Sequence, residues 1–232
     1  MAIPDDYSIM RVLILLLLVH LVTALACGSS YVVQAGGSIQ AALSAAHDGD
    51  TIVVMGGKYY EHLQVKRAVK LTGQGMPALD ATASGSAITL RADGITVQGF
   101  KIVNSGSWPT ETADEGAIKV LSNNNTVSGN DVSNNFNGIL ILGGRNNSIR
   151  ENTVTGNLDY GIRLQGANNN TIFNNRLDKN KQNAFDDGQN LWDGNYYSDF
   201  DVPGEGCSDN GAGKCPASFS VPGGKSVDQH PV

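Results

Sequence analysis

The chain has 232 residues, with 16 Lys and Arg against 22 Asp and Glu and a formal charge of −6. This acidic balance argues against nucleic acid as a partner, because nucleic-acid binders carry basic surfaces that neutralise phosphates. The length suits one domain of ordinary size, and the 28 glycines suit short strands joined by tight turns.

The first 26 residues are typical of a secretory signal peptide. An apolar run from Val12 to Ala26 follows Arg11 and is too short to span a bilayer. The run ends in Ala-Leu-Ala, the A-x-A pattern of a cleavage site. We therefore predict a signal peptide over 1–26, with Met1 and Met10 both open as the start. The mature protein is then exported and lies outside the cell, at its surface or in the periplasm.

The three cysteines fit an exported chain. Cys27 follows the cleavage pattern and is a candidate for lipidation, which would be the protein's one membrane attachment, with plain secretion as the alternative. Cys207 and Cys215 lie eight residues apart in a Gly-rich tail. Because such pairs oxidise readily outside the cytoplasm, we predict a disulfide between them.

The segment 27–50 is predicted to hold an N-terminal strand and a short capping helix. Apolar residues recur with helical spacing from Ser38 to His47, and Ser38 is placed to cap the start of the helix. A solenoid needs such a cover, because its first coil has no neighbour on one side. Thr51 to Val54 then begins the repeats as a strand.

A pattern of about 22 residues repeats through the middle of the chain, beginning at Gly116, Gly138 and Gly161. Short apolar pairs separated by Asn and Gly are typical of one coil of a parallel β-solenoid. Alternation along each strand sends equivalent residues inward, where they stack about 4.8 Å apart. Four inward columns result: Ile88, Ile118, Ile139 and Ile162; Leu90, Val120, Ile141 and Leu164; Val97, Val127, Ile149 and Ile172; and Ile102, Val132, Val154 and Leu177.

Asparagines also recur with the period. Asn130, Asn152 and Asn175 are predicted to form a structural ladder, since Asn side chains can donate and accept along the stack. A second set, Asn124, Asn146 and Asn169, begins N-x-S/T triplets at equivalent turns. These three are candidate glycosylation sites in a host that has the machinery outside the cell.

The residues carry a family resemblance. Ser38 to Ala42, Gly49 to Val54 and Gly57 to Glu61 resemble the start of pectin-lyase-like right-handed parallel β-helices. The middle coils are similar to the NosD type, the periplasmic copper-processing and carbohydrate-binding/sugar-hydrolase (CASH) group. The segment from Asn190 to Phe200 resembles the ending of NosD-like repeats. The resemblance implies an all-β fold: a single-stranded right-handed parallel β-helix over 51–189, with a loop-rich cap over 190–232.

The family name raises copper as a ligand. The mature chain offers His47, His62, His230, Met55 and Met76 besides its cysteines, and their spacing forms no ligand cluster. We therefore expect no copper site and no required cofactor. Calcium has a better candidate in Asp199, Asp201, Glu205 and Asp209, because closely spaced oxygen ligands can wrap a hard cation. The alternative is an acidic, solvent-exposed tail.

Catalytic candidates are weak. A glycosidase needs two carboxylates facing one groove, and Asp186 and Asp187 are adjacent, so alternation gives only one of them an outward position. Asp186 aligns with an inward column. Lys119 and Arg163 are expected to project outward from one sheet with Leu140 between them, as a strip that could contact an acidic sugar or as an ordinary solvated face.

Aromatic residues offer possible sugar-stacking surfaces. Trp108 lies in the long turn between Asn104 and Glu115, and Tyr196 and Tyr197 lie in the tail beside Trp192. Trp192 itself is expected to cover the last coil.

The sequence favours a non-catalytic, monomeric surface or periplasmic module that binds a polysaccharide or a cell-envelope glycan. A polysaccharide lyase or glycoside hydrolase is one alternative. A structural repeat fragment and a copper-processing accessory protein are two others.

Overall fold

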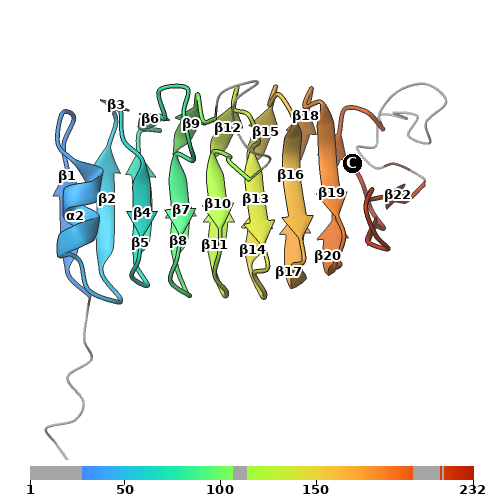
Figure 1. The fold of residues 1–232 in the computed structure, drawn as a ribbon, viewed down its shortest axis with the longest axis horizontal. Coiled ribbons are helices and arrows are strands. Elements are labelled where there is room, and N and C mark those ends of the chain that lie inside the picture. Colours follow the sequence, from blue (N-terminus) through green and yellow to red (C-terminus); the bar gives the residue numbers. More distant parts are fainter. Residues whose placement is uncertain (1–27, 107–113, 201–214, 216) are drawn as a thin grey trace, which may run out of the picture.

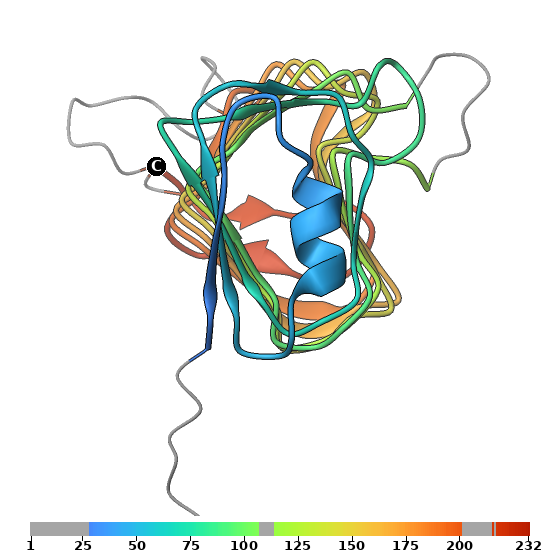
Figure 2. The same ribbon diagram turned by 90° about the vertical axis from the view of Figure 1, so that its left-hand side faces the viewer.

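The structure, a computed structural model, describes residues 28–106, 114–200, 215 and 217–232. It is a right-handed parallel β-solenoid of about seven turns with coils about 22 residues apart, which confirms the predicted fold. Each complete coil contributes one strand to each of three sheets that run the length of the molecule, and the coils at the two ends contribute fewer (Figure 1). Viewed along the solenoid, the sheets enclose an interior that the single described helix covers at the N-terminal end (Figure 2).

The strands fall into three sheets, named sheet 1, sheet 2 and sheet 3. Sheet 1 contains, in spatial order, β1 (Ser30–Val33), β2 (Thr51–Met55), β5 (Lys70–Gln74), β8 (Thr96–Gln98), β11 (Thr126–Ser128), β14 (Ser148–Arg150), β17 (Asn168–Phe173), β20 (Gln189–Asp193), β23 (Val227–Asp228) and β22 (Phe219–Ser220). Sheet 2 contains β3 (Lys58–Tyr59), β6 (Ala78–Asp80), β9 (Lys101–Val103), β12 (Asp131–Ser133), β15 (Thr153–Thr155), β18 (Arg176–Asp178) and β21 (Tyr196–Tyr197). Sheet 3 contains β4 (Leu63–Val65), β7 (Ile88–Leu90), β10 (Ile118–Val120), β13 (Ile139–Leu142), β16 (Tyr160–Gln165) and β19 (Gln182–Asp186).

The predicted inward columns form the core. Ile118 is in register with Ile88 on one side and with Ile139 on the other, and Ile139 is in register with Ile162. These four side chains are fully buried. Burying one such side chain contributes about 1.5 to 3 kcal/mol. The stacked columns are therefore the main source of stability.

Helix α2 (Ile39–Ala45) covers the first coil and buries Ile39 and Leu43. The Ser38 hydroxyl accepts the N–H of Ala41, so the predicted cap is confirmed. The Glu61 carboxylate adds to it by accepting the N–H groups of Ile39 at 2.8 Å and Gln40 at 3.0 Å. The helix ends earlier than predicted. Asp50 accepts the N–H of His47 at 2.7 Å, and this contact belongs to the turn that follows the helix.

The Asn ladder is present and fully buried. The Asn152 side-chain oxygen accepts both the backbone N–H of Asn130 at 3.1 Å and its side-chain amide at 3.0 Å. Asn175 does the same for Asn152, and Asn195 does it for Asn175. Every step therefore points the same way, with the amide NH₂ donating toward the C-terminal end.

Two more ladders follow other corners of the coil with the same polarity. One runs through Asn125, Asn147, Asn170 and Asn190. The other runs through Asn135, Asn157 and Asn180 to Asn183. These side chains replace the hydrogen bonds that the turn backbone would otherwise make with water, so the corners can be packed without buried unpaired N–H groups.

Candidate functional site

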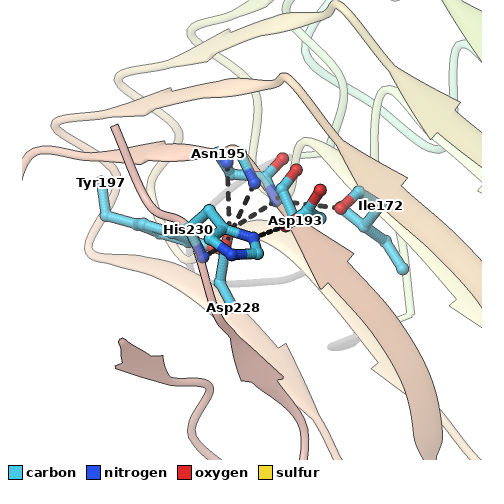
Figure 3. Close-up of polar contacts among 7 residues, drawn as sticks. Ile172, Asp193, Asn195, Tyr197, Asp228 and His230 are labelled. Carbon is cyan, nitrogen blue, oxygen red and sulfur yellow. Dashed lines mark hydrogen bonds and ion pairs between the residues drawn. The ribbon is translucent and has the colours of Figure 1, made fainter. Parts of the chain in front are cut away.

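The C-terminal segment docks on the last coil through one buried carboxylate, Asp228. It accepts the backbone N–H of Asn195 at 3.0 Å, the Asn195 side-chain amide at 2.9 Å and the Tyr197 hydroxyl at 3.0 Å (Figure 3). The N–H groups of Gly194 and His230 also donate to it. Because a carboxylate only accepts, Asp228 ends a ladder whose last member offers donors.

The ladder that runs from Asn125 to Asn190 also ends on a carboxylate. Asp186 is fully buried, as its inward alignment predicted, and accepts the Asn190 amide at 2.8 Å and the Trp192 indole N–H at 2.9 Å. Trp192 is completely buried, so its expected role as a cover of the last coil is confirmed. On the last ladder, Asn183 donates to Asp199 at 2.7 Å.

The docked segment forms one wall of a groove. Trp192 in β20 is paired with Asp228 in β23, and the Ser226 hydroxyl lies 3.4 Å from both the N–H and the carbonyl of Asn190. The groove has a volume of about 510 Å³ on the outer side of sheet 1. Its lining is Asn169, Asn170, Thr171, Gly188, Gln189, Asn190, Leu191, Lys225, Ser226, Val227 and Gln229.

The groove combines polar and apolar chemistry. Leu191 is 60% exposed within it, beside the exposed amides of Asn169, Gln189 and Gln229 and the Lys225 ammonium group. Amides both donate and accept hydrogen bonds. No Asp, Glu, His or Cys is among the described residues that line it. The groove therefore suits binding of a hydroxyl-rich ligand and carries no carboxylate for acid catalysis.

Sequence reasoning missed this groove. Its wall comes from residues 225–229, which lie outside the periodic pattern. One signal was available: if Trp192 points inward, alternation along the strand places Leu191 outward. A leucine facing solvent at a position where the preceding coils carry Thr171 and Ser148 marks a change of surface.

The predicted strip on sheet 3 is only partly exposed. The register places Lys119, Leu140 and Arg163 in one outward row, as expected. Leu140 is nevertheless buried, so the expectation of a solvated strip is wrong at its centre. Lys119 lies 3.5 Å from the Glu115 carboxylate, and the Arg163 guanidinium lies 5.0 Å from the Tyr160 ring and 5.8 Å from the Phe185 ring. Asp187 accepts the N–H of Gly166 at 2.6 Å.

The tail tyrosines differ from each other. Tyr197 is buried, and its ring stacks on Phe219 at 4.0 Å between centroids, so its expected role in sugar stacking is wrong. Burial, followed by the charge of Asp228, raises the pKa of the Tyr197 phenol well above its ordinary value. Tyr196 is half-buried, with the Arg176 guanidinium 4.1 Å from its ring. Trp108 lies outside the described residues.

Several predicted sites fall partly outside the described residues. Of the calcium candidates, Asp199 is described and is hydrogen-bonded to Asn183, whereas Asp201, Glu205 and Asp209 are not described. Cys27 and Cys207 are also outside them, and Cys215 is disulfide-bonded. The sequon residues Asn124, Asn146 and Asn169 are exposed and share a left-handed backbone, with φ of 57°, 56° and 58°.

The fold and the groove define a parallel β-helix repeat protein with a ligand-sized surface groove at its C-terminal end. The chain belongs to the NosD family, described as periplasmic copper-binding protein, whose model matches residues 47–202. A search of the curated proteins finds no match. Within the described ranges, no helix has the length and apolar character needed to cross a membrane.

Two solved structures are similar in fold. One is pectin methylesterase in complex with hexasaccharide VII, at 15% identity and a TM-score of 0.44 over 75% of this chain and 57% of that one. The other is a point mutant of pectin methylesterase in complex with hexasaccharide IV, at 15% identity and a TM-score of 0.40 over 72% of this chain and 65% of that one. The chain thus spans less than two thirds of the length of each.

The family description raises copper again. Copper sites use imidazole or sulfur ligands held close together. Across residues 28–106, 114–200, 215 and 217–232, no three His, Cys, Asp or Glu side chains form a metal-binding group. His62 contacts the carbonyl of Ser86 at 2.9 Å, and His230 contacts Asp193 at 2.7 Å. The described donors therefore do not fit a copper centre.

Proposed function

We propose that the protein is an exported, non-catalytic glycan-binding module and that the groove beside Leu191 holds the sugar chain. The observation that carries the proposal is the lining of the groove, where exposed amides surround one exposed leucine. Small-ligand sites combine an apolar surface with a few convergent polar groups in this way. Membership of a family described as periplasmic supports export.

The groove offers both kinds of contact that a sugar ring needs. Asn169, Gln189 and Gln229 can each donate to and accept from hydroxyl groups, and the Leu191 side chain offers an apolar surface for the C–H face of a ring. Lys225 adds a positive charge at the rim. This charge favours a sugar that carries a carboxylate or a sulfate.

A binding role is favoured over hydrolysis because no carboxylate is among the described residues that line the groove, and the two buried carboxylates of this end are hydrogen-bonded inside the fold. A glycosidase needs one proton-donating and one ionised carboxylate facing the substrate. Asp186 is buried under Trp192, and Asp228 accepts five hydrogen bonds. Asp187 is bound to the backbone of Gly166.

The experiment is a glycan array probed with the protein and with two leucine variants. Leu191→Ser should lose binding, whereas Leu158→Ser should retain it, because Leu158 is equally exposed at 59% but lies outside the groove. Gln229→Ala should weaken binding of the same glycans. Equal binding by both leucine variants would contradict the assignment of the groove.

A second measurement separates binding from catalysis. The glycans retained on the array are incubated with the protein, and the solution is assayed for new reducing ends and for unsaturated sugar ends. We expect neither product. Formation of either one, lost in Leu191→Ser and retained in Leu158→Ser, would turn the proposal into one for a lyase or a hydrolase at the same groove.

A further inference from the structure

Within the part of the chain that the structure describes, the N-terminal end of sheet 1 is an open strand edge. Among the described strands, β1 pairs only with β2, and it is the outermost strand of the sheet. The pairing is parallel and places Val32 beside Val53. Strand edges of this kind offer a row of N–H and C=O groups to another strand.

Alternation along β1 decides which backbone groups face outward. The N–H of Thr51 donates to the carbonyl of Ser29 at 2.8 Å, so Ser29 faces β2. In a parallel ladder the next residues that face β2 are then Tyr31 and Val33. The N–H and C=O groups of Ser30 and Val32 consequently point away from β2, toward the open side.

The side chains at this end do not protect the edge. Natural edges are usually blocked by charged residues, proline or bulges. Here Val32 is 57% exposed on the outer face of the sheet, and Ser30 is exposed. Helix α2, which lies beside β1 at the same end (Figure 2), exposes Ala41, Ser44 and Ala45 and carries no charge in its first or last turn.

The opposite end of the sheet is different. There β23 is followed by the antiparallel two-residue strand β22, and the donors of the last ladder residue Asn195 are taken by Asp228. The C-terminal end therefore does not offer a long parallel edge that would match β1 head to tail. A contact that uses the same surface on both partners is closed and two-fold symmetric.

We propose that two copies of this chain pair through β1, antiparallel and about a two-fold axis at Val32. In such a pair, each Val32 N–H donates to the Val32 carbonyl of the partner copy, since opposed residues of an antiparallel pair exchange both bonds. The two Val32 side chains then lie side by side on the outer face. Sheet 1 continues without interruption from one copy into the next.

The test is the molar mass of the protein by sedimentation from about 1 µM to about 1 mM, the range over which a weak to moderate dimer forms. The mass should rise toward twice the monomer mass. Val32→Pro removes the central N–H donor at a position where an edge strand tolerates proline, and it should remain monomeric. Val32→Lys places two like charges opposite each other and should raise the dimer dissociation constant by about tenfold or more.

Leu158→Lys is the matched control, because Leu158 is 59% exposed and far from β1 in the chain. It should dimerise like the unchanged protein. Circular dichroism shows whether each variant keeps its β-structure, and Val32→Lys decides if Val32→Pro does not fold. A monomer at every concentration, or a dimer unaffected by Val32→Lys, overturns the proposal.

Amide hydrogen exchange gives a site-specific readout. The Val32 amide should exchange more slowly at high protein concentration than at low concentration, while the Leu191 amide on β20, near the other end of sheet 1, should not change. A mass increase without protection at Val32 would mean that the copies meet through another surface, which also overturns the proposal.

Discussion

Asn195 gives both its backbone N–H and its side-chain amide to one oxygen of Asp228, at 3.0 and 2.9 Å. Asn195 itself accepts the same pair of bonds from Asn175. Each Asn of the ladder thus donates its N–H groups to the side-chain oxygen of the next residue. The residue that ends the ladder therefore only has to accept hydrogen bonds. Asp228 meets that need and simultaneously fixes the segment that walls the groove.

Asp228→Asn should destabilise the protein strongly. Both carboxylate oxygens accept donors, so in either orientation the new NH₂ group would oppose donors, those of Gly194 and His230 or those of Asn195 and Tyr197. The negative charge that the five donors share would also be lost. We expect a loss of about 3 kcal/mol in unfolding free energy, measured by urea denaturation. Asp131→Asn is the control. Asp131 forms a partly exposed ion pair with Lys101 at 4.0 Å, and its loss should cost less than about 1 kcal/mol. Equal effects would contradict a special role for Asp228.

Asn152→Asp is the reverse exchange, made in the middle of the same ladder. The Asn152 amide donates to the carbonyl of Val127 and to Asn175, both at 3.0 Å. A carboxylate there would face two acceptors, and we expect a loss of about 3 kcal/mol or a local loss of structure. Asn124→Asp lies at an exposed turn with the same left-handed tolerance and should stay within about 0.5 kcal/mol of the unchanged protein. Thermal unfolding of the two variants, compared side by side, measures the difference.

Stability should fall at alkaline pH because of Tyr197. Burial, and next the charge of Asp228, raises the pKa of Tyr197 in the folded protein. As pH rises above about 10, the ordinary pKa of tyrosine, the unfolded chain loses the phenol proton and the folded protein keeps it. Ionisation therefore favours the unfolded state. The melting temperature should therefore hold below about pH 10 and fall as the pH rises beyond it.

Tyr197→Phe should flatten this fall while costing about 1 kcal/mol at neutral pH through the lost bond to Asp228. Tyr60→Phe is the matched control, because Tyr60 is 63% exposed. If Tyr197→Phe and the unchanged protein lose stability in parallel above about pH 10, the alkaline sensitivity arises elsewhere.

Glycosylation at Asn169 should block the groove, because Asn169 is both the first residue of a sequon and part of the lining. Protein secreted from a glycosylating host and modified there should bind fewer array glycans than unmodified protein. Asn169→Gln keeps an amide that both donates and accepts and cannot be modified, so it should restore binding. Asn124→Asp should not restore it. Restoration by both variants would contradict a specific role for Asn169.

The repeats could be predicted from the sequence because their signal is periodic. Ile88, Ile118, Ile139 and Ile162 recur with the coil, so the period alone aligns them, and their register is as predicted. The Asn ladder followed for the same reason. A period fixes which residues are equivalent, and alternation fixes which of them point inward.

Contacts outside the repeats were harder to predict, because the segments that form them have no sequence period. Asp228 meets Asn195 from 33 residues further along the chain, and no spacing rule predicts that contact. Tyr197 was expected to be exposed because it lies in a loop-rich tail, yet the tail folds back over it. Leu140 was expected on an open face and is buried. Burial at Tyr197 depends on the irregular tail rather than on the coil, whereas Leu140 lies in a central coil, where alternation alone predicted the wrong exposure.

The shared direction of the three ladders makes the coils interchangeable and the last one unique. A coil duplicated or removed in the middle would find the same donors on one side and the same acceptors on the other. Trimming the chain before Val227 would instead leave Asn195 with donors and no acceptor. Central coils can therefore be gained or lost during evolution, provided that the segment carrying Asp228 is kept.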